Sequence, residues 1–223
     1  MSIPIESVDQ LSLAKALTKK TQSLCLGLEF GEAEILDLVT PTTADLLKWW
    51  FSEDAVASRG NLNFHDGQKQ AILNTIVAHE VFGEQQSRWS LLDLYQAIAP
   101  DALLSGKRME EVSQAKHSHP KYCMKMATGT GKTWVLQALM IWQLLNKTHA
   151  LAEGMDDVRF TRQFMIVAPG LIVYERLLDA FCGKLIPSGN GLRDFASSDV
   201  ARYADLFIPD IRGLTASLFS LSR

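Results

Sequence analysis

The sequence predicts an α/β fold in which helices flank a parallel sheet. Two segments, residues 122–126 and 162–170, are short and largely apolar, as expected of strands that are buried in a sheet. Each is followed by a longer segment with apolar residues at helical spacing, at residues 132–145 and 171–182, and Gly183 is expected to end the second helix. A strand–helix–strand–helix order makes the two strands parallel, because the helix carries the chain back along the sheet.

A helical extension is predicted ahead of this domain, over residues 1–60. Residues 8–19 place apolar side chains at roughly helical spacing, and residues 41–51 give a second, short helix. Thr42 or Thr43 is expected to cap the second helix, because a threonine hydroxyl accepts a hydrogen bond from an unpaired N–H group of the first turn. These helices are expected to serve as packing elements.

Residues 61–223 are predicted to form the α/β domain, with a helical insertion at about 83–120. A helix is expected over residues 67–81, where apolar side chains recur at helical spacing after a cluster of turn-forming residues. The insertion is polar, contains prolines and a glycine, and has two further helical segments at residues 87–98 and 108–117.

The composition is that of an ordinary globular protein. The formal net charge is −3 and no run of five like charges occurs, so a contact with a polynucleotide would have to be local. No apolar run reaches the about 18 residues that a membrane span needs. The three cysteines lie far apart, which favours a reducing cytoplasm over a secreted disulfide framework. His117, His119 and Cys123 are close in sequence but lack a fourth ligand, so we expect no zinc site.

A phosphate-binding loop is predicted between the first strand and its helix, in the segment ATGTGKT at residues 127–133. Gly129 and Gly131 lack a Cβ atom, so the backbone there can turn several N–H groups toward phosphate oxygens. Lys132 begins the helix and can reach the β- and γ-phosphates of ATP, while the Thr133 hydroxyl can bind Mg²⁺. The predicted nucleotide-binding residues of the loop are Thr128, Gly129, Thr130, Gly131, Lys132 and Thr133. The alternative is a glycine-rich turn that ends in Lys-Thr by chance.

The loop departs from the strict pattern at Met126, which stands where the first glycine is expected. In this form, MATGTGKT resembles motif I of the superfamily 2 helicases and translocases, in particular the motor subunits of type III and type I restriction enzymes. The segment FHDGQKQAI at residues 64–72 is similar to the part of that family in which a glutamine contacts adenine, which implies this role for Gln68. The alternative for Gln68 is an ordinary polar residue at a helix start.

A third segment, FMIVAPGLIVYERL at residues 164–177, resembles motif Ia of the same family. The resemblance implies that Pro169 and Gly170 end a strand and present a helix N-terminus to a phosphate of DNA, the alternative being a plain strand-to-helix turn. Arg176 either adds a charge contact or pairs with a neighbouring carboxylate. Together the motifs imply a partial RecA-like domain that uses ATP and Mg²⁺, with DNA and a modification methyltransferase subunit as partners.

The resemblance also implies residues that this sequence lacks. Hydrolysis in the family uses an adjacent Asp-Glu pair, and no Asp-Glu dipeptide occurs in the 223 residues. The about 90 residues after Lys132 are too few for a second RecA-like domain of ordinary size. We therefore expect the chain to be the N-terminal fragment of a DNA-dependent helicase or translocase. Alone, this fragment is expected to bind Mg·ATP weakly and to hydrolyse little or none of it. The catalytic residues are unknown.

The sequence is also compatible with two other kinds of protein. One is a stand-alone nucleotide-binding protein, such as a small kinase or a nucleotide-gated interaction module, with the insertion as its partner surface. The other is a non-functional remnant that barely folds. A DNA-stimulated ATPase assay separates the motor from the stand-alone protein, and cooperative thermal unfolding argues against the remnant.

Overall fold

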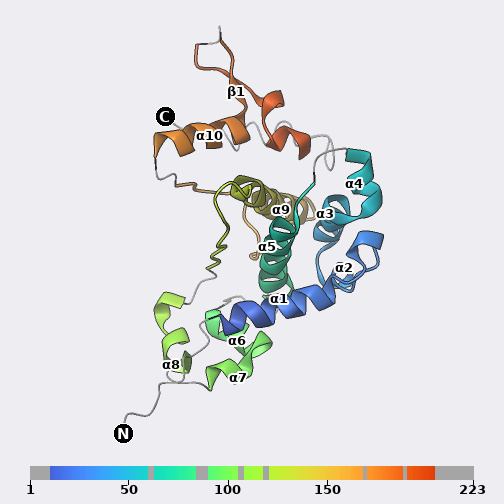
Figure 1. Ribbon diagram of the computed structural model, residues 1–223, viewed down its shortest axis with the longest axis vertical. Coiled ribbons are helices and arrows are strands. Elements are labelled where there is room, and N and C mark those ends of the chain that lie inside the picture. Colours follow the sequence, from blue (N-terminus) through green and yellow to red (C-terminus); the bar gives the residue numbers. More distant parts are fainter. Residues whose placement is uncertain are drawn as a thin grey trace. The chain divides into compact units, whose positions relative to one another are not determined.

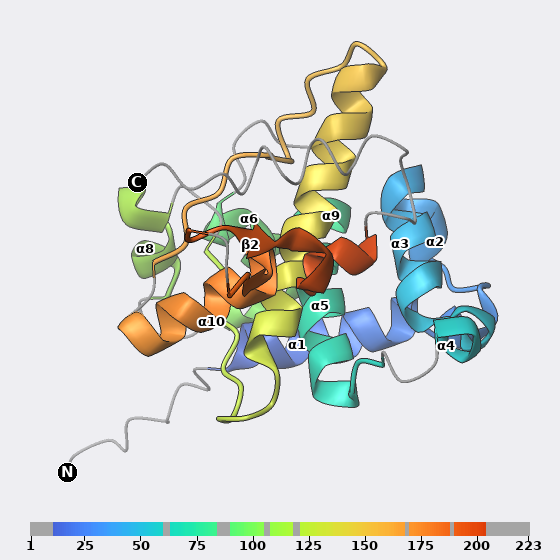
Figure 2. The same cartoon turned by 90° about the horizontal axis from the view of Figure 1, so that it is seen from above.

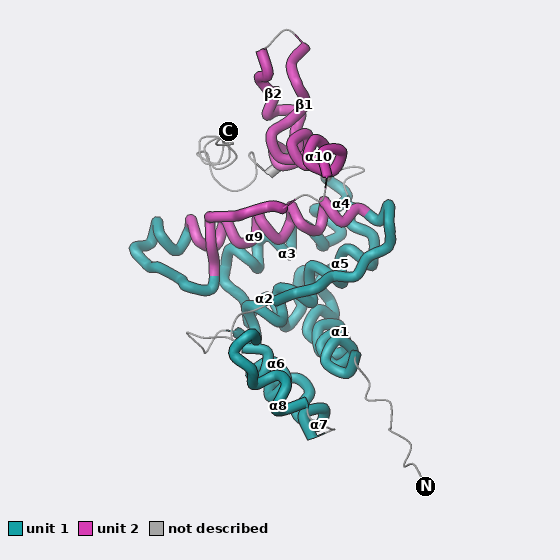
Figure 3. Tube along the Cα trace, turned by 90° about the vertical axis from the view of Figure 1, so that its left-hand side faces the viewer, with its two compact units in different colours: residues 1–130, 149–159 teal, residues 131–148, 160–223 magenta. Residues whose placement is uncertain are grey.

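The computed structural model divides the chain into two compact units (Figure 3). Unit 1 comprises residues 1–130 and 149–159, and unit 2 comprises residues 131–148 and 160–223. The residues whose structure is described are 11–59, 63–83, 90–104, 108–117, 121–167, 170–187 and 190–203.

Most of the described residues lie in helices (Figure 1). The α-helices are α1 (Ser12–Leu24), α2 (Ile35–Leu38), α3 (Pro41–Phe51), α4 (Glu53–Arg59), α5 (Asp66–Ile76), α6 (Leu91–Ile98), α7 (Pro100–Leu103), α8 (Arg108–Val112), α9 (Lys132–Ala152) and α10 (Leu171–Cys182). The shorter elements are η1 (Leu28–Phe30), the π-helical η2 (Val77–Val81), η3 (Ala115–His117), β1 (Lys184–Leu185), β2 (Arg193–Asp194), η4 (Phe195–Ser197) and η5 (Val200–Tyr203). No helix within the described ranges has the length and apolar character needed to cross a membrane.

The core of unit 1 forms where the N-terminal helices meet α5. Helix α1 crosses the end of α5, and α2, α3 and α4 gather beside each other on one side of the unit (Figures 1 and 2). Leu46, Leu47 and Trp50 of α3 and Ile72 and Ile76 of α5 are almost fully removed from water. Each such side chain contributes about 1.5–3 kcal/mol through burial. The N-terminal segment therefore contributes packing elements, as expected, with the apolar side chains of α3 buried in this core.

The helix predicted over residues 67–81 is confirmed, with a change of geometry near its end. Helix α5 continues directly into η2, where Phe82 N–H donates to the Val77 carbonyl at 3.1 Å. This i to i+5 bond inserts one extra residue into the turn. His79 and Glu80 lie in this π-helical turn, and their side chains contact different neighbours.

The predicted N-cap of α3 is wrong. The cap is Thr40, whose Oγ1 accepts from Thr43 N–H at 3.2 Å, whereas Thr42 or Thr43 was expected to fill this role. The reason is Pro41, whose fixed φ suits the first helical position and places the cap one residue before it. Thr43 is buried inside the first turn, and its hydroxyl donates to the Glu80 carboxylate at 2.8 Å.

The predicted helices of unit 2 are confirmed. Helix α10 stops at Gly183, which has φ +86° and so takes a conformation that suits glycine. Its neighbour α9 extends the predicted helix, and Trp142 of α9 packs edge-to-face on Phe160 with ring centroids 5.6 Å apart. Gln137, which is buried on α9, donates to the Ala180 carbonyl of α10 at 3.3 Å.

The predicted parallel sheet is not seen in the described residues. The sheet found there has two strands, β1 and β2, which are antiparallel, with Lys184 opposite Asp194. Residues 121–127, which contain the first predicted strand, and residues 163–167, which form part of the second, have no regular secondary structure. Residues 168 and 169 of the second predicted strand lie outside the described residues. In the second segment Met165 is 89% exposed and Val167 is 80% exposed. An apolar run is typical of a strand but does not supply its partner, and a strand forms only where a neighbouring strand receives its N–H and C=O groups.

Candidate functional site

The glycine-rich loop forms a tight turn closed on the Ala127 carbonyl. Thr130 Oγ1 donates to this oxygen at 2.7 Å, and Thr130 N–H approaches it at 3.4 Å. On either side of Thr130, Gly129 has φ +81° and Gly131 has φ +69°. Both are left-handed conformations, which cost other residues about 1–2 kcal/mol. The glycines are therefore required by the backbone path, as their place in the sequence predicts.

Gly129 also leaves space above the loop. A Cβ atom at this position would meet no other heavy atom within 4 Å, so no protein neighbour forces the absence of a side chain. An approaching ligand would use this space, because backbone N–H groups can reach a phosphate closely only where no side chain intervenes. The loop thus combines two left-handed glycines with open space at Gly129.

Lys132 and Thr133 occupy the first two positions of α9, immediately after the loop. Lys132 is exposed, Thr133 is partly buried, and Trp134 N–H donates to the Gly131 carbonyl at 3.0 Å to start the helix. A helix of 21 residues has a positive dipole end here, which favours an anion, and a hydroxyl at the second position is a hard oxygen ligand suited to Mg²⁺. Thr128 is exposed in the preceding turn.

Gln68 lies against the loop and is largely buried. It is 7% exposed, its Nε2 donates to the Thr130 carbonyl at 3.1 Å, and its Oε1 accepts from His65 N–H at 3.0 Å. Gln68 therefore lies against the loop with its amide bonded to the protein backbone, and the expected contact with adenine stays a prediction.

His65 contacts the same loop atom and was not predicted as a site residue. Its Nε2 lies 3.0 Å from the Thr130 carbonyl oxygen, and its Nδ1 accepts from Gln68 N–H at 3.4 Å. With Gln68 it forms a capping box at the start of α5. The spacing of three residues between them is the sequence signal of this motif, but histidine is not among the usual capping residues, which hid it.

The aromatic residue before His65 packs into unit 1. The ring of Phe64 lies 5.8 Å from that of Phe51 and 6.3 Å from that of Trp50, measured between centroids. Phe64 therefore precedes the cap as an anchor and fixes the direction from which the chain enters α5.

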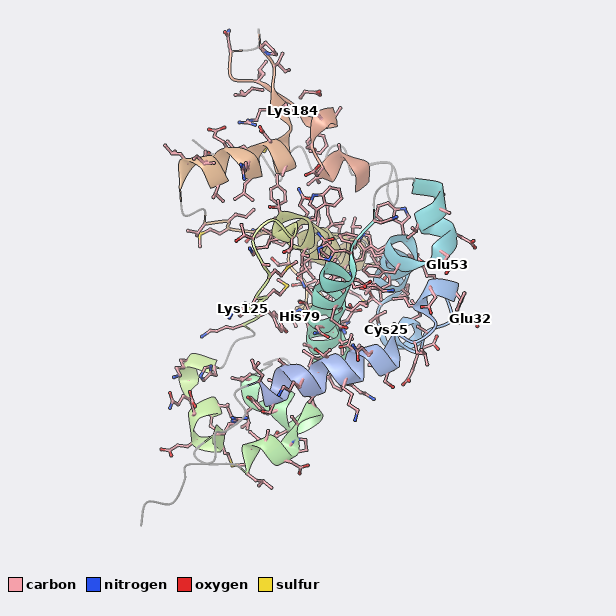
Figure 4. The ribbon with its side chains drawn as sticks, viewed as in Figure 1. Cys25, Glu32, Glu53, His79, Lys125 and Lys184 are labelled. Atoms are coloured by element: carbon pink, nitrogen blue, oxygen red, sulfur yellow. The ribbon has the colours of Figure 1, made fainter. Side chains whose placement is uncertain are left out.

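The segment that leads to the loop runs along α5 and η2. Thr75 Oγ1 approaches Met124 Sδ at 3.7 Å, and Tyr122 Oη lies 3.1 Å from His79 Nδ1. His79 Nε2 lies 2.6 Å from the Arg159 carbonyl oxygen, and burial lowers the pKa of His79 from its ordinary value of 6.5. Figure 4 labels His79 in this region of unit 1. A neutral His79 thus joins the approach to the loop with the segment after α9.

The expected DNA-contact residues lie in unit 2. Gly170 is the N-cap of α10 and has extended backbone, with φ −179° and ψ 165°. Pro169 lies outside the described residues, and so does His119 of the histidine–cysteine group at residues 117–123. Glu175 and Asp179 carry the carboxylates that neighbour Arg176 in the sequence, and both pair with Arg193, at 2.9 Å and 2.6 Å.

Comparisons with known proteins match the motifs of this site to one family. The family model described as the res subunit of type III restriction enzymes matches residues 61–204, which include Gln68, the loop and Gly170. The searches of curated proteins and of solved structures gave no match. The family implies a helicase-like, nucleotide-binding module with a RecA-like fold, an interaction with DNA, and the usual use of ATP and Mg²⁺. Since the match covers more than half of the 223 residues, the chain belongs to the type III restriction enzyme res subunit family.

Proposed function

We propose that residues 128–133 bind Mg·ATP and that the chain is the nucleotide-binding part of a DNA-dependent motor for restriction. The observation that carries the proposal is the pair of left-handed glycines, Gly129 and Gly131, directly before Lys132 at the start of a long helix. The backbone of the turn and the helix N-terminus offer N–H groups to phosphate oxygens, and the Lys132 ammonium neutralises part of their charge. Thr133 would hold the Mg²⁺ that accompanies the nucleotide.

The proposal covers nucleotide binding and assigns no hydrolytic residue. In phosphoryl transfer a carboxylate orients or activates the attacking water, and a second one holds the metal ion. The 223 residues contain no Asp-Glu dipeptide in that order. We therefore expect this chain alone to bind Mg·ATP with little or no turnover.

A contact with DNA at the start of α10 is the second part of the proposal. Gly170 as the N-cap carries no side chain that would keep a phosphate from the N–H groups of the first helical turn. This contact would position the DNA duplex, or the strand along which the motor moves, without recognising the base sequence. A modification methyltransferase subunit is the proposed protein partner, as the family resemblance implies.

A glycine substitution with a matched control tests the nucleotide site. Gly129→Ala introduces strain at φ +81°, and Gly31→Ala does so at φ +76°, and at neither position would the new Cβ meet an atom within 4 Å. Both variants are expected to lose about 1–2 kcal/mol of stability. Only Gly129→Ala is expected to weaken binding of Mg·ATP, measured by isothermal titration calorimetry. Equal ATP affinity of the two variants would count against the loop as the site.

A further inference from the structure

The start of α5 holds one backbone oxygen of the phosphate loop with two side chains. His65 and Gln68 first satisfy each other: His65 Nδ1 accepts from Gln68 N–H, and Gln68 Oε1 accepts from His65 N–H. Their remaining nitrogens, Nε2 in both residues, then meet at the Thr130 carbonyl oxygen, at 3.0 Å and 3.1 Å. The capping box thus fixes which atoms of the two side chains face the loop.

The direction of these two hydrogen bonds follows from the capping box. A neutral imidazole whose Nδ1 accepts carries its hydrogen on Nε2, so His65 donates to the Thr130 carbonyl. The Gln68 amide nitrogen is also a donor, so the carbonyl oxygen accepts from both side chains. Two donors on the two lone pairs of one oxygen hold the peptide group between Thr130 and Gly131 in one orientation.

This orientation matters for a phosphate ligand because a trans peptide group is planar. Its C=O and N–H bonds point in opposite directions, so fixing the Thr130 carbonyl also fixes the direction of Gly131 N–H. Gly131 has φ +69°, in the turn that would receive the phosphate. Holding the carbonyl toward α5 therefore directs this N–H to the opposite side of the peptide group.

Gly67 leaves room for the histidine ring, and Phe64 anchors the chain before it. A Cβ atom at Gly67 would lie 3.3 Å from Cε1 and 3.4 Å from Nδ1 of His65, so a larger residue would press on the ring. Phe64 is anchored in the aromatic cluster with Phe51 and Trp50, which fixes the backbone just before His65. The His65 ring can therefore keep its contacts with Gln68 and Thr130.

We propose that His65 and Gln68 are positioning residues whose two hydrogen bonds to the Thr130 carbonyl, called the latch below, set the phosphate-binding geometry of the loop. The inference rests on the proposed nucleotide site. His65 then helps to orient the loop, and Gln68 acts on the polyphosphate through the Thr130 carbonyl. A Gln68 amide that is mostly buried and bonded to Thr130 acts on any ligand that carries a triphosphate.

Two variants break the latch and keep the helix cap. In His65→Asn the new side chain remains a good N-cap but lacks the ring atoms that reach Thr130. In Gln68→Glu one oxygen still accepts from His65 N–H, while the other replaces the donating amide and repels the Thr130 carbonyl. Gln70→Glu is the matched control, because the same change two residues later affects a side chain bonded to Asn74.

The experiment measures binding of Mg·ATP, Mg·GTP and inorganic tripolyphosphate to the full chain. Loss of one hydrogen bond of ordinary strength corresponds to about 5- to 10-fold in affinity. The latch predicts that both variants weaken all three ligands by about this common factor, and that Gln70→Glu weakens none. Weakening of ATP alone by Gln68→Glu would overturn the proposal in favour of adenine recognition, and unchanged binding of all three ligands would overturn it as well.

The Gly131 amide resonance in ¹⁵N–¹H spectra is the second readout. Removing a hydrogen bond from the Thr130 carbonyl alters the same peptide group, so both variants are expected to shift this resonance in the absence of ligand. If the wild-type chain binds none of the three ligands, the proposed nucleotide site fails, and the Gly131 resonance still decides whether the latch exists. An unshifted resonance would overturn the latch.

Discussion

Glu80 is predicted to hold the N-terminus of α3 against η2, so its removal will destabilise unit 1. The side chain is fully buried, and its two carboxylate oxygens accept from Thr40 N–H at 2.5 Å and from the Thr43 hydroxyl at 2.8 Å. Glu80→Ala leaves both donors without this partner inside the protein. At about 1–3 kcal/mol for each of the two hydrogen bonds lost, the expected loss in the free energy of unfolding is about 2–6 kcal/mol.

Glu80→Gln separates charge from shape. The amide oxygen can accept from Thr40 N–H, and the amide nitrogen can donate to Thr43 Oγ1, so both contacts persist without the negative charge. The expected loss is about 1–2 kcal/mol, the difference between charge-assisted and neutral hydrogen bonds. Urea unfolding followed by tryptophan fluorescence measures both variants, with the exposed Glu32, labelled in Figure 4, changed to alanine as a control. A loss below about 1 kcal/mol for Glu80→Ala, or equal losses for both Glu80 variants, would refute the reasoning.

Two further predictions concern other parts of the chain. Gly183→Ala places a Cβ 1.7 Å from the Asp194 carbonyl oxygen at φ +86°, so it is expected to separate the β1–β2 hairpin from α10, and limited proteolysis within residues 184–194 will accelerate. Gly154→Ala, at φ +76° with open space around it, is the control and is expected to leave the proteolysis of residues 184–194 unchanged. His79 has a pKa lowered by burial, so below its ordinary pKa of 6.5 the unfolded chain binds a proton that the folded chain resists. The free energy of unfolding is expected to fall as the pH drops from about 8 to about 5, and His79→Gln is expected to flatten this slope, while an unchanged slope would be inconsistent with a neutral, buried His79.

The sequence predicts the helices well because their signal is local. Apolar spacing of 3.6 residues identifies α5, α9 and α10, and a glycine that must adopt positive φ marks the end of α10. The N-cap of α3 was missed by two or three positions, because the effect of Pro41 on the first turn outweighed the usual preference for a threonine next to the apolar stripe.

The sheet could not be predicted from the same kind of signal. The segments around Met124 and Met165 have the apolar character of strands, yet a strand depends on backbone partners that are distant in sequence. In unit 1, the first segment instead contacts α5 and η2 through Met124 and Tyr122. The second leaves Met165 and Val167 exposed in the described structure. Composition alone does not distinguish these outcomes from a paired strand.

The sequence predicts the backbone conformation of the loop, and the nucleotide site there stays a prediction. Gly129 and Gly131 have the left-handed conformations that the loop pattern requires. The contacts of Gln68 were not foreseen, because a glutamine amide can bond a base or a carbonyl equally well, and only the position of the Thr130 carbonyl distinguishes them. His65 escaped notice because its role arises from the fold, which brings the start of α5 to the loop.

Calorimetric titration of Mg·ATP into wild-type, Lys132→Ala and Lys125→Ala chains tests the central claim most directly. Lys125 is exposed and precedes the loop. Lys125→Ala therefore makes the same change in charge but keeps the Lys132 ammonium that is proposed to contact the phosphates. A hydrogen bond to a charged partner contributes about 1.5–3 kcal/mol, so Lys132→Ala is expected to weaken binding by at least about 10-fold. Lys125→Ala is expected to bind as the wild type does. Unchanged affinity of Lys132→Ala would contradict the assignment of the loop as a nucleotide site.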